Sequence, residues 1–112
     1  MEVVYRTKKL AKQAETAASL RKSFGTIGGK KFLQRLNEFA SADCLEDLRN
    51  LPGARIHELG GDRKGQFAAD LHQPYRLIFI PADDPPPKKE DGGWEWKSIT
   101  IIEIQEVTNY HD

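Results

Sequence analysis

The sequence has little cysteine, no long apolar run and no surplus of either charge. Cys44 is the single cysteine among 112 residues, so an internal disulfide cannot form and a cysteine-rich metal site is excluded. The longest apolar runs, 77–80 and 101–102, have the length of strands rather than of a membrane-spanning helix. Residues 1–13 turn polar after Val4 and contain no apolar signal region. We therefore expect a cytoplasmic protein that does not contact a membrane.

The net charge is zero, with 17 basic and 17 acidic residues, which argues against an avid nucleic-acid binder. The two halves differ, however. Residues 1–64 contain 13 Lys and Arg against 8 Asp and Glu, whereas residues 65–112 contain 4 against 9. The first half could present a basic face to a polyanion, although solvated helix faces rich in lysine would give the same count.

The length predicts one domain, residues 1–112, with a single core. Its first half indicates a short strand at 3–5 and then two helices. The first helix is expected over 8–24, with a thin apolar face of Leu10, Ala14, Ala17, Ala18 and Leu20. Gly25 and the pair Gly28-Gly29 are expected to break it. A better packed helix follows, with its apolar positions at Phe32, Leu33, Leu36, Phe39 and Ala40.

The second half has the pattern of strands. These are expected at 55–59, 66–71, 75–80 and 98–107, with a glycine-rich turn at 60–62. Residues 81–97 are rich in proline, glycine and charge, so we expect a long surface loop whose Trp94 and Trp96 fold back onto the domain. The fold class is therefore α+β: a short strand, two helices and a twisted, mainly antiparallel sheet of about four strands.

Histidine and arginine are the candidate reactive groups. His57, His72 and His111 are expected mid-strand, in a turn and after the last strand. Arg76 interrupts an otherwise apolar interior strand, where charge is rare. If the strands share one sheet, His57 and His111 could converge with Arg76 on one surface, where imidazoles move protons and a guanidinium holds phosphate. A histidine in a strand is, however, more often a hydrogen-bonded structural residue than a catalytic one.

The sequence contains two weaker candidate sites. The segment 60–65, with Arg63 and Lys64, could offer backbone N–H groups and two cations to a phosphate. A plain hairpin turn, in which glycines supply positive φ and the charges are solvated, explains it equally well. Three scattered histidines without paired spacing give no metal site, so we expect no metal and no cofactor.

Three motifs carry a resemblance to a known family. They are IHELGGDRKG at 56–65, YRLIF at 75–79 and VTNYH at 107–111. In this order and spacing they resemble the RelE/ParE superfamily, specifically the HigB-type toxins of type II toxin–antitoxin systems. The resemblance is strongest from Leu51 onward.

The resemblance implies a RelE-like fold and a ribosome-dependent mRNA endonuclease that cuts through the substrate 2′-OH without metal or cofactor. It implies several partners: the ribosome and mRNA, and an antitoxin, a HigA-like helix-turn-helix protein. Operator DNA would be reached only through that antitoxin. An antitoxin of this kind would silence the toxin by binding it.

The resemblance also implies roles for individual residues. His57 and His111 would carry protons, Tyr110 would orient or share that role, and Arg76 would stabilise charge on the phosphoryl oxygens. Asn109 departs from the pattern, because many relatives have Asp there and an amide cannot accept a proton as a carboxylate does.

The same resemblance implies an RNA-binding set: Arg63, Lys64, Arg55, Lys8 and Lys12. Two alternatives stay open. The neutral charge and Asn109 favour a non-nuclease toxin of the same fold, such as a ParE-like inhibitor of DNA gyrase. A degenerate toxin would retain only antitoxin and operator binding.

Overall fold

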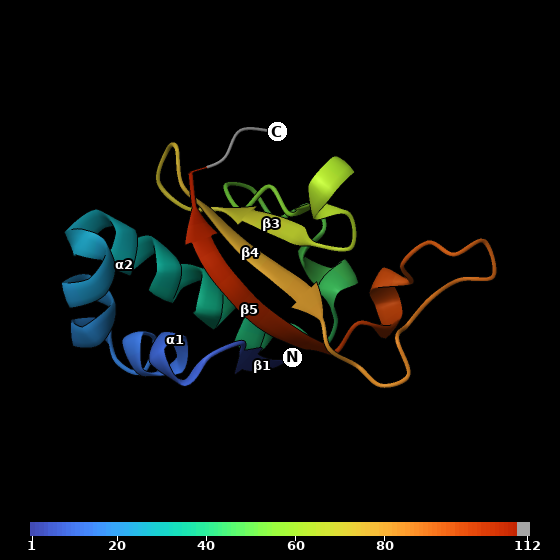
Figure 1. Cartoon of the computed structure of the whole chain (residues 1–112), viewed down its shortest axis with the longest axis horizontal. Coiled ribbons are helices and arrows are strands. Elements are labelled where there is room, and N and C mark those ends of the chain that lie inside the picture. The colour runs from blue at the N-terminus through green and yellow to red at the C-terminus, as the bar shows by residue number, and fades with distance from the viewer. Residues whose placement is uncertain (110–112) are drawn as a thin grey trace.

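The computed structural model describes residues 1–109 as an α+β fold. Its helices and strands are, in chain order, β1 (Glu2–Tyr5), α1 (Lys8–Gln13), α2 (Ala17–Ser41), β2 (His57–Glu58), β3 (Phe67–Asp70), β4 (Arg76–Pro81) and β5 (Ile101–Thr108). Short 3-10 turns occupy Leu45–Leu48, Gly61–Arg63 and Trp96–Ser98. Figure 1 shows α1 and the start of α2 at one end of the long axis and the loop after β4 at the other. Over the part of the chain described here, each helix is too short or too polar to cross a membrane.

The sheet has the strand order β1-β5-β4-β3-β2. Its last four strands in sequence pair antiparallel, as predicted. The sheet holds five strands rather than about four, because β1 joins it at the edge and runs parallel to β5. The register between β4 and β5 shifts at Ile78/Phe79, which marks a local irregularity next to Arg76.

The prediction of one continuous helix over 8–24 is wrong. α1 ends at Gln13 and α2 begins at Ala17, because Thr16 caps the second helix. The Thr16 hydroxyl accepts from the Ser19 backbone N–H at 2.9 Å, and the Ser19 hydroxyl accepts from the Thr16 N–H at 2.9 Å. This reciprocal pair satisfies two N–H groups that a helix start leaves without partners.

The glycines of α2 have two different roles. Gly25 has φ 82° and ψ 170°, a conformation nearly restricted to glycine, and α2 bends sharply there. The predicted break at Gly28-Gly29 is wrong, because the helix continues through both residues. A Cβ at Gly29 would lie 2.7 Å from the Arg21 backbone N, and one at Gly28 would lie 3.0 Å from His72 Cε1. These glycines therefore permit close packing instead of ending the helix.

The core lies between the helices and one face of the sheet, which we call the covered face. Phe39 of α2 contacts Phe79 of β4 with ring centroids 5.3 Å apart, and Phe67 of β3 stacks on Phe79 at 5.5 Å. Trp96 is 5% exposed and meets Phe67 edge-on at 5.3 Å. Trp94 also packs against this core, so the predicted return of both tryptophans is confirmed.

Three strands are shorter than predicted, and two of them have a clear local reason. The segment at 55–59 reduces to His57–Glu58, because Arg55 adopts φ 43° and leaves the extended conformation. The last strand begins at Ile101 instead of residue 98, because Trp96–Ser98 form a 3-10 turn. Asp83 holds the ends of the long loop together, since its carboxylate accepts from the Thr100 and Ile101 N–H groups at 3.1 Å.

The other face of the sheet, which we call the polar face, carries only a small apolar cluster. This cluster is formed by Leu59, Ala68 and Ile78 and does not include a residue of α1 or α2. Charged residues of the same sheet lie beside it: Asp70, Arg76 and Glu106. The sheet therefore separates an apolar layer from a polar one.

Candidate functional site

The strand register brings His57 and Arg76 to the polar face. His57 of β2 lies opposite Ala68 of β3, and Ala68 lies opposite Ile78 of β4. Arg76 is two residues before Ile78, and Asp70 is two residues after Ala68. Because paired residues share a face and side chains alternate along a strand, all five point the same way. His57 and Arg76 therefore lie on the same face of the sheet, on strands that β3 separates.

The carboxylate of Asp70 lies between two arginines on this face. It accepts from Arg55 Nε at 3.1 Å and from Arg55 Nη2 at 3.3 Å. Arg76 Nε lies 3.6 Å from the same carboxylate. The side chains of Asp70 and Arg76 are 13% and 10% exposed, whereas that of Arg55 is 51% exposed. Two guanidinium groups thus share one carboxylate, which leaves a positive surplus suited to an anion.

Arg35 of α2 supports this arrangement from the covered face. It is 2% exposed, and its Nε donates to the Asp70 carbonyl at 2.7 Å. Its Nη2 donates to the Gly53 carbonyl and its Nη1 to Glu38 Oε1, both at 2.8 Å. The Asp70 N–H in turn donates to the Ala54 carbonyl at 2.7 Å. Arg35 therefore fixes the backbone on both sides of the Arg55–Asp70 pair.

The His57 ring has a defined hydrogen bond at one nitrogen. Nδ1 lies 2.8 Å from the Arg55 carbonyl oxygen. Since a carbonyl only accepts, Nδ1 carries the proton, and a neutral ring then has its lone pair on Nε2. Arg55 holds that carbonyl in place with its φ of 43°, a strained conformation of the kind found at functional sites.

The predicted phosphate turn is tied to the sheet. Arg63 Nη1 donates to Gln66 Oε1 at 3.0 Å and to Glu106 Oε2 of β5 at 3.3 Å. Lys64 is exposed beside it. Arg63 therefore orients the turn against the polar face, and Lys64 extends from it into solvent.

The remaining predicted residues are not all brought to this face. Lys8 and Lys12 are exposed on α1, which packs against α2 and β1, whereas His57 is on β2 at the opposite edge of the sheet. Asn109 is exposed and directly follows Thr108, the residue paired with Arg76. Tyr110 and His111 lie outside the described residues.

Sequence reasoning missed three residues of this site: Arg35, Asp70 and Glu106. Two of them had a signal. Arg35 falls between Phe32 and Phe39 on the apolar face of its helix, and Asp70 follows three apolar residues of a strand. Both are charges at positions where a core residue is expected, which is the argument that identified Arg76.

Known proteins do not identify the site. No protein-family model matches the chain, and no curated protein matches its sequence. Within residues 1–109, no three His, Cys, Asp or Glu side chains form a group that could hold a metal ion.

Proposed function

We propose that this protein is the toxin of a type II toxin–antitoxin system and cuts mRNA on the ribosome. The observation that supports this most is the register of the sheet, which puts His57 and Arg76 on one face. It also pairs Arg76 with Thr108, immediately before Asn109, Tyr110 and His111. The motifs that resemble HigB-type toxins thus belong to strands of one sheet, in which β4 and β5 are neighbours and β3 lies between β4 and β2.

The proposed reaction is an internal transfer at one phosphodiester. A base removes the proton of the ribose 2′-OH, O2′ attacks the phosphorus, and the bond from phosphorus to O5′ breaks. The acid then protonates O5′, which leaves a 2′,3′-cyclic phosphate and a 5′-OH. His57 is the base in this scheme, since its Nδ1 hydrogen bond to Arg55 directs the lone pair to Nε2. His111 is the acid and Tyr110 its helper, as the resemblance implies.

Arg76 stabilises the charge that develops on the phosphoryl oxygens. A guanidinium presents a fixed fork of donors, and burial strengthens its attraction to an anion. Asp70 keeps Arg76 oriented on the polar face, and Arg55 adds a second guanidinium at the same carboxylate. The RNA itself supplies the nucleophile, so the scheme needs no cofactor.

The partners of this activity are the ribosome, mRNA and an antitoxin of the helix-turn-helix class, with operator DNA reached through the antitoxin. Lys64, which is exposed beside Arg63, would hold the RNA backbone. Lys8 and Lys12 would meet a more distant part of the RNA, because α1 lies at the opposite edge of the sheet.

Growth on induced expression tests the proposal. The wild-type chain is expected to arrest growth, and His57→Ala and Arg76→Ala are expected to relieve the arrest. Arg49→Ala is the matched control, because Arg49 pairs with Glu46 and covers Trp96 away from the polar face. Arrest by both site variants as strong as that of the wild type would contradict the assigned chemistry.

A toxin of the same fold that does not cut RNA is the second candidate. Asp70 already pairs with both arginines of the site, and Asn109 replaces the carboxylate that many relatives have. Primer extension on RNA from arrested cells separates the two candidates. Cuts within translated codons support the nuclease, whereas intact transcripts with DNA damage support an inhibitor of DNA gyrase. Absence of any arrest would favour a degenerate toxin that only binds its antitoxin and operator.

A further inference from the structure

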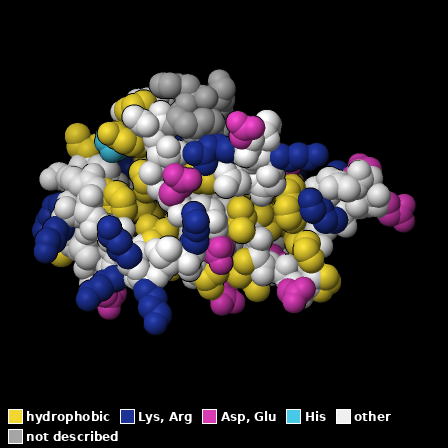
Figure 2. All heavy atoms as spheres, in the orientation of Figure 1, with side chains coloured by type: hydrophobic (Ala, Val, Ile, Leu, Met, Phe, Trp, Pro, Cys, Tyr) yellow, Lys and Arg dark blue, Asp and Glu magenta, His cyan; other side chains and the backbone are white. Residues whose placement is uncertain are grey.

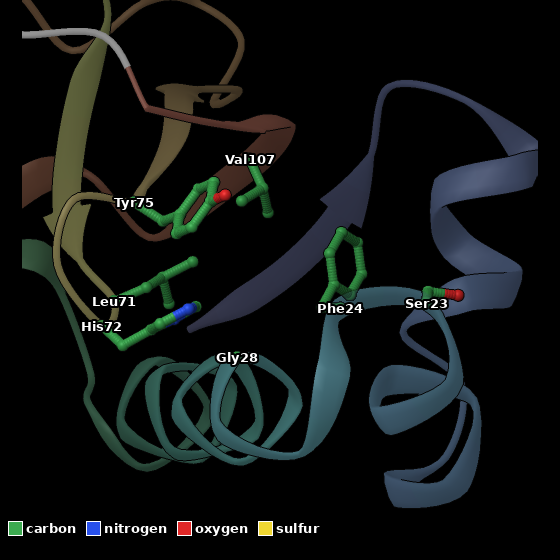
Figure 3. Close-up of a pocket in the computed structure, with 7 residues that line it drawn as sticks. All are labelled: Ser23, Phe24, Gly28, Leu71, His72, Tyr75 and Val107. Atoms are coloured by element: carbon green, nitrogen blue, oxygen red, sulfur yellow. The ribbon is translucent and has the colours of Figure 1, made fainter.

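A cavity of about 270 Å³ lies at the end of the sheet, on the covered face. It opens between the bend of α2 and the turn before β4. Figure 3 shows Tyr75 and His72 on one side of it and Phe24 on the other, with Gly28 at its base and Val107 of β5 at its edge. Its size is just below the range of about 300–1,000 Å³ for drug-sized ligands, so it suits one ring system.

The walls of this cavity are aromatic. The rings of His72 and Tyr75 lie 4.9 Å apart and are inclined by 34°. Among the residues that line the cavity, Tyr75 is the large hydrophobic side chain that is exposed, at 38%. Exposed aromatic surface beside a cavity marks a binding site for a planar or apolar group.

The stretch of α2 around the bend carries several cations and no carboxylate. Four cations flank Gly25 on α2: Arg21, Lys22, Lys30 and Lys31. No acidic residue occurs between Glu15 and Glu38, and none of the four makes an ion pair with another described residue. The arginines of the polar face, in contrast, are all paired with carboxylates. Figure 2 shows Lys and Arg gathered over the end formed by α1 and α2.

We propose that this cavity takes one base of a single-stranded RNA, stacked on Tyr75, with the flanking phosphates on the cations of the α2 bend. Stacking on aromatic side chains beside a basic surface is how proteins bind single strands. This inference adds an RNA contact to the proposed function, and the identification of the ligand as RNA rests on that function. The strand is either the mRNA substrate or a single-stranded part of ribosomal RNA, which share this chemistry.

Binding without cleavage tests the proposal. A fluorescent single-stranded RNA pentamer is titrated with the His57→Ala protein, and the same sugar–phosphate chain without bases serves as reference. We expect the bases to strengthen binding about tenfold and Tyr75→Ala to remove that gain. Tyr75→Phe keeps the ring and is expected to keep the affinity. Ile27→Ala, beside the cavity but outside its lining, is the control and is expected to change nothing.

Gly28→Ala provides a second variant that fills the cavity. Its Cβ would lie 3.0 Å from His72 Cε1, while alanine favours the helix more than glycine does. We expect it to weaken binding of the pentamer about as much as Tyr75→Ala, while the close contact with His72 and the helix propensity of alanine have opposite effects on stability. Circular dichroism confirms that each variant is folded.

Equal binding of the pentamer and of the chain without bases would overturn the proposal, as would wild-type affinity in both Tyr75→Ala and Gly28→Ala. Binding of an acidic peptide in place of RNA would also overturn it. Because binding is measured without cleavage, failure of the nuclease proposal leaves this test intact. In proteins that retain His57, slower cutting of ribosome-bound mRNA by Tyr75→Ala that varies with the base beside the cut assigns the cavity to the substrate. A loss that is the same for every base assigns it to ribosomal RNA.

Discussion

The covered face and the polar face belong to the same strands but differ in what their side chains contact. On the covered face, Phe67 and Phe79 are fully buried against α2 and the tryptophans of the loop. On the polar face, the nearly buried Asp70 pairs with two arginines. Desolvating charges costs several kcal/mol per ion, so stability alone favours apolar residues at such positions. The packing of the covered face therefore maintains the fold, whereas stability does not account for the charges of the polar face.

The largest effect is expected from Phe79→Ala on the covered face. Phe79 is fully buried and touches the rings of both Phe39 and Phe67. Removing it should lower the free energy of unfolding by about 3–5 kcal/mol, because the surrounding side chains cannot close the cavity. Urea denaturation followed by circular dichroism measures this.

Glu106→Gln on the polar face is the variant to compare with Phe79→Ala. The Glu106 side chain is 42% exposed and pairs with Arg63 at 3.3 Å. A partly exposed pair contributes about 0–1 kcal/mol, so stability should barely change. If Glu106→Gln proved as destabilising as Phe79→Ala, the division of roles between the two faces would be wrong.

Asp70→Asn is expected to have the next largest effect. It leaves the nearly buried Arg76 without its carboxylate and should cost about 2–4 kcal/mol in urea denaturation. Glu46→Gln, which breaks an exposed pair with Arg49, is the matched control and should cost less than about 1 kcal/mol. Equal stability of Asp70→Asn and the wild type would show that the charges of the polar face are not coupled through Asp70.

Gly25→Ala tests the bend that brings α2 across the covered face. A Cβ there would meet nothing within 4 Å, so the cost comes only from φ 82° and ψ 170°. We expect a loss of about 1–3 kcal/mol in thermal or urea unfolding. A gain in stability would mean that the bend does not need glycine.

The smallest effect is expected from Tyr5→Phe at alkaline pH. Burial raises the pKa of Tyr5 above its ordinary value of 10.0. Its contribution to stability is therefore present below pH 10.0 and is lost as pH rises through the raised value, where the phenolate forms more readily in the unfolded chain. Tyr5→Phe should weaken the fall in stability above that pH, as urea denaturation across pH 8 to 12 would show. If stability fell equally in Tyr5→Phe and the wild type, groups other than Tyr5 would cause the fall.

Composition and periodicity predicted the general architecture because those signals are local. Val3 to Tyr5 and the apolar positions from Phe32 to Phe39 lie in the elements that the pattern favours. The helix boundary at Thr16 was not predicted because Thr16 and Ser19 are a weak capping signal, whereas the alanines around them favour an uninterrupted helix. The parallel pairing of β1 with β5 joins residues about a hundred positions apart and has no local signal.

The candidate site was predictable only in part, for a related reason. Arg76 stood out as a charge in an apolar strand, and the same argument would have found Asp70 and Arg35. Their mutual contacts depend on the register of three strands and on the packing of α2, which no single segment determines. The conformation of Arg55, with positive φ in a residue other than glycine, is likewise imposed by tertiary contacts.

The ends of the cut RNA test the central claim most directly. Purified protein is mixed with ribosomes carrying a defined mRNA, and the new termini are identified by end-group chemistry. The account predicts 2′,3′-cyclic phosphate and 5′-OH ends, and a rate at least about 100-fold lower for folded Arg76→Ala. Products ending in 3′-OH and 5′-phosphate, or an unchanged rate for Arg76→Ala, would contradict it.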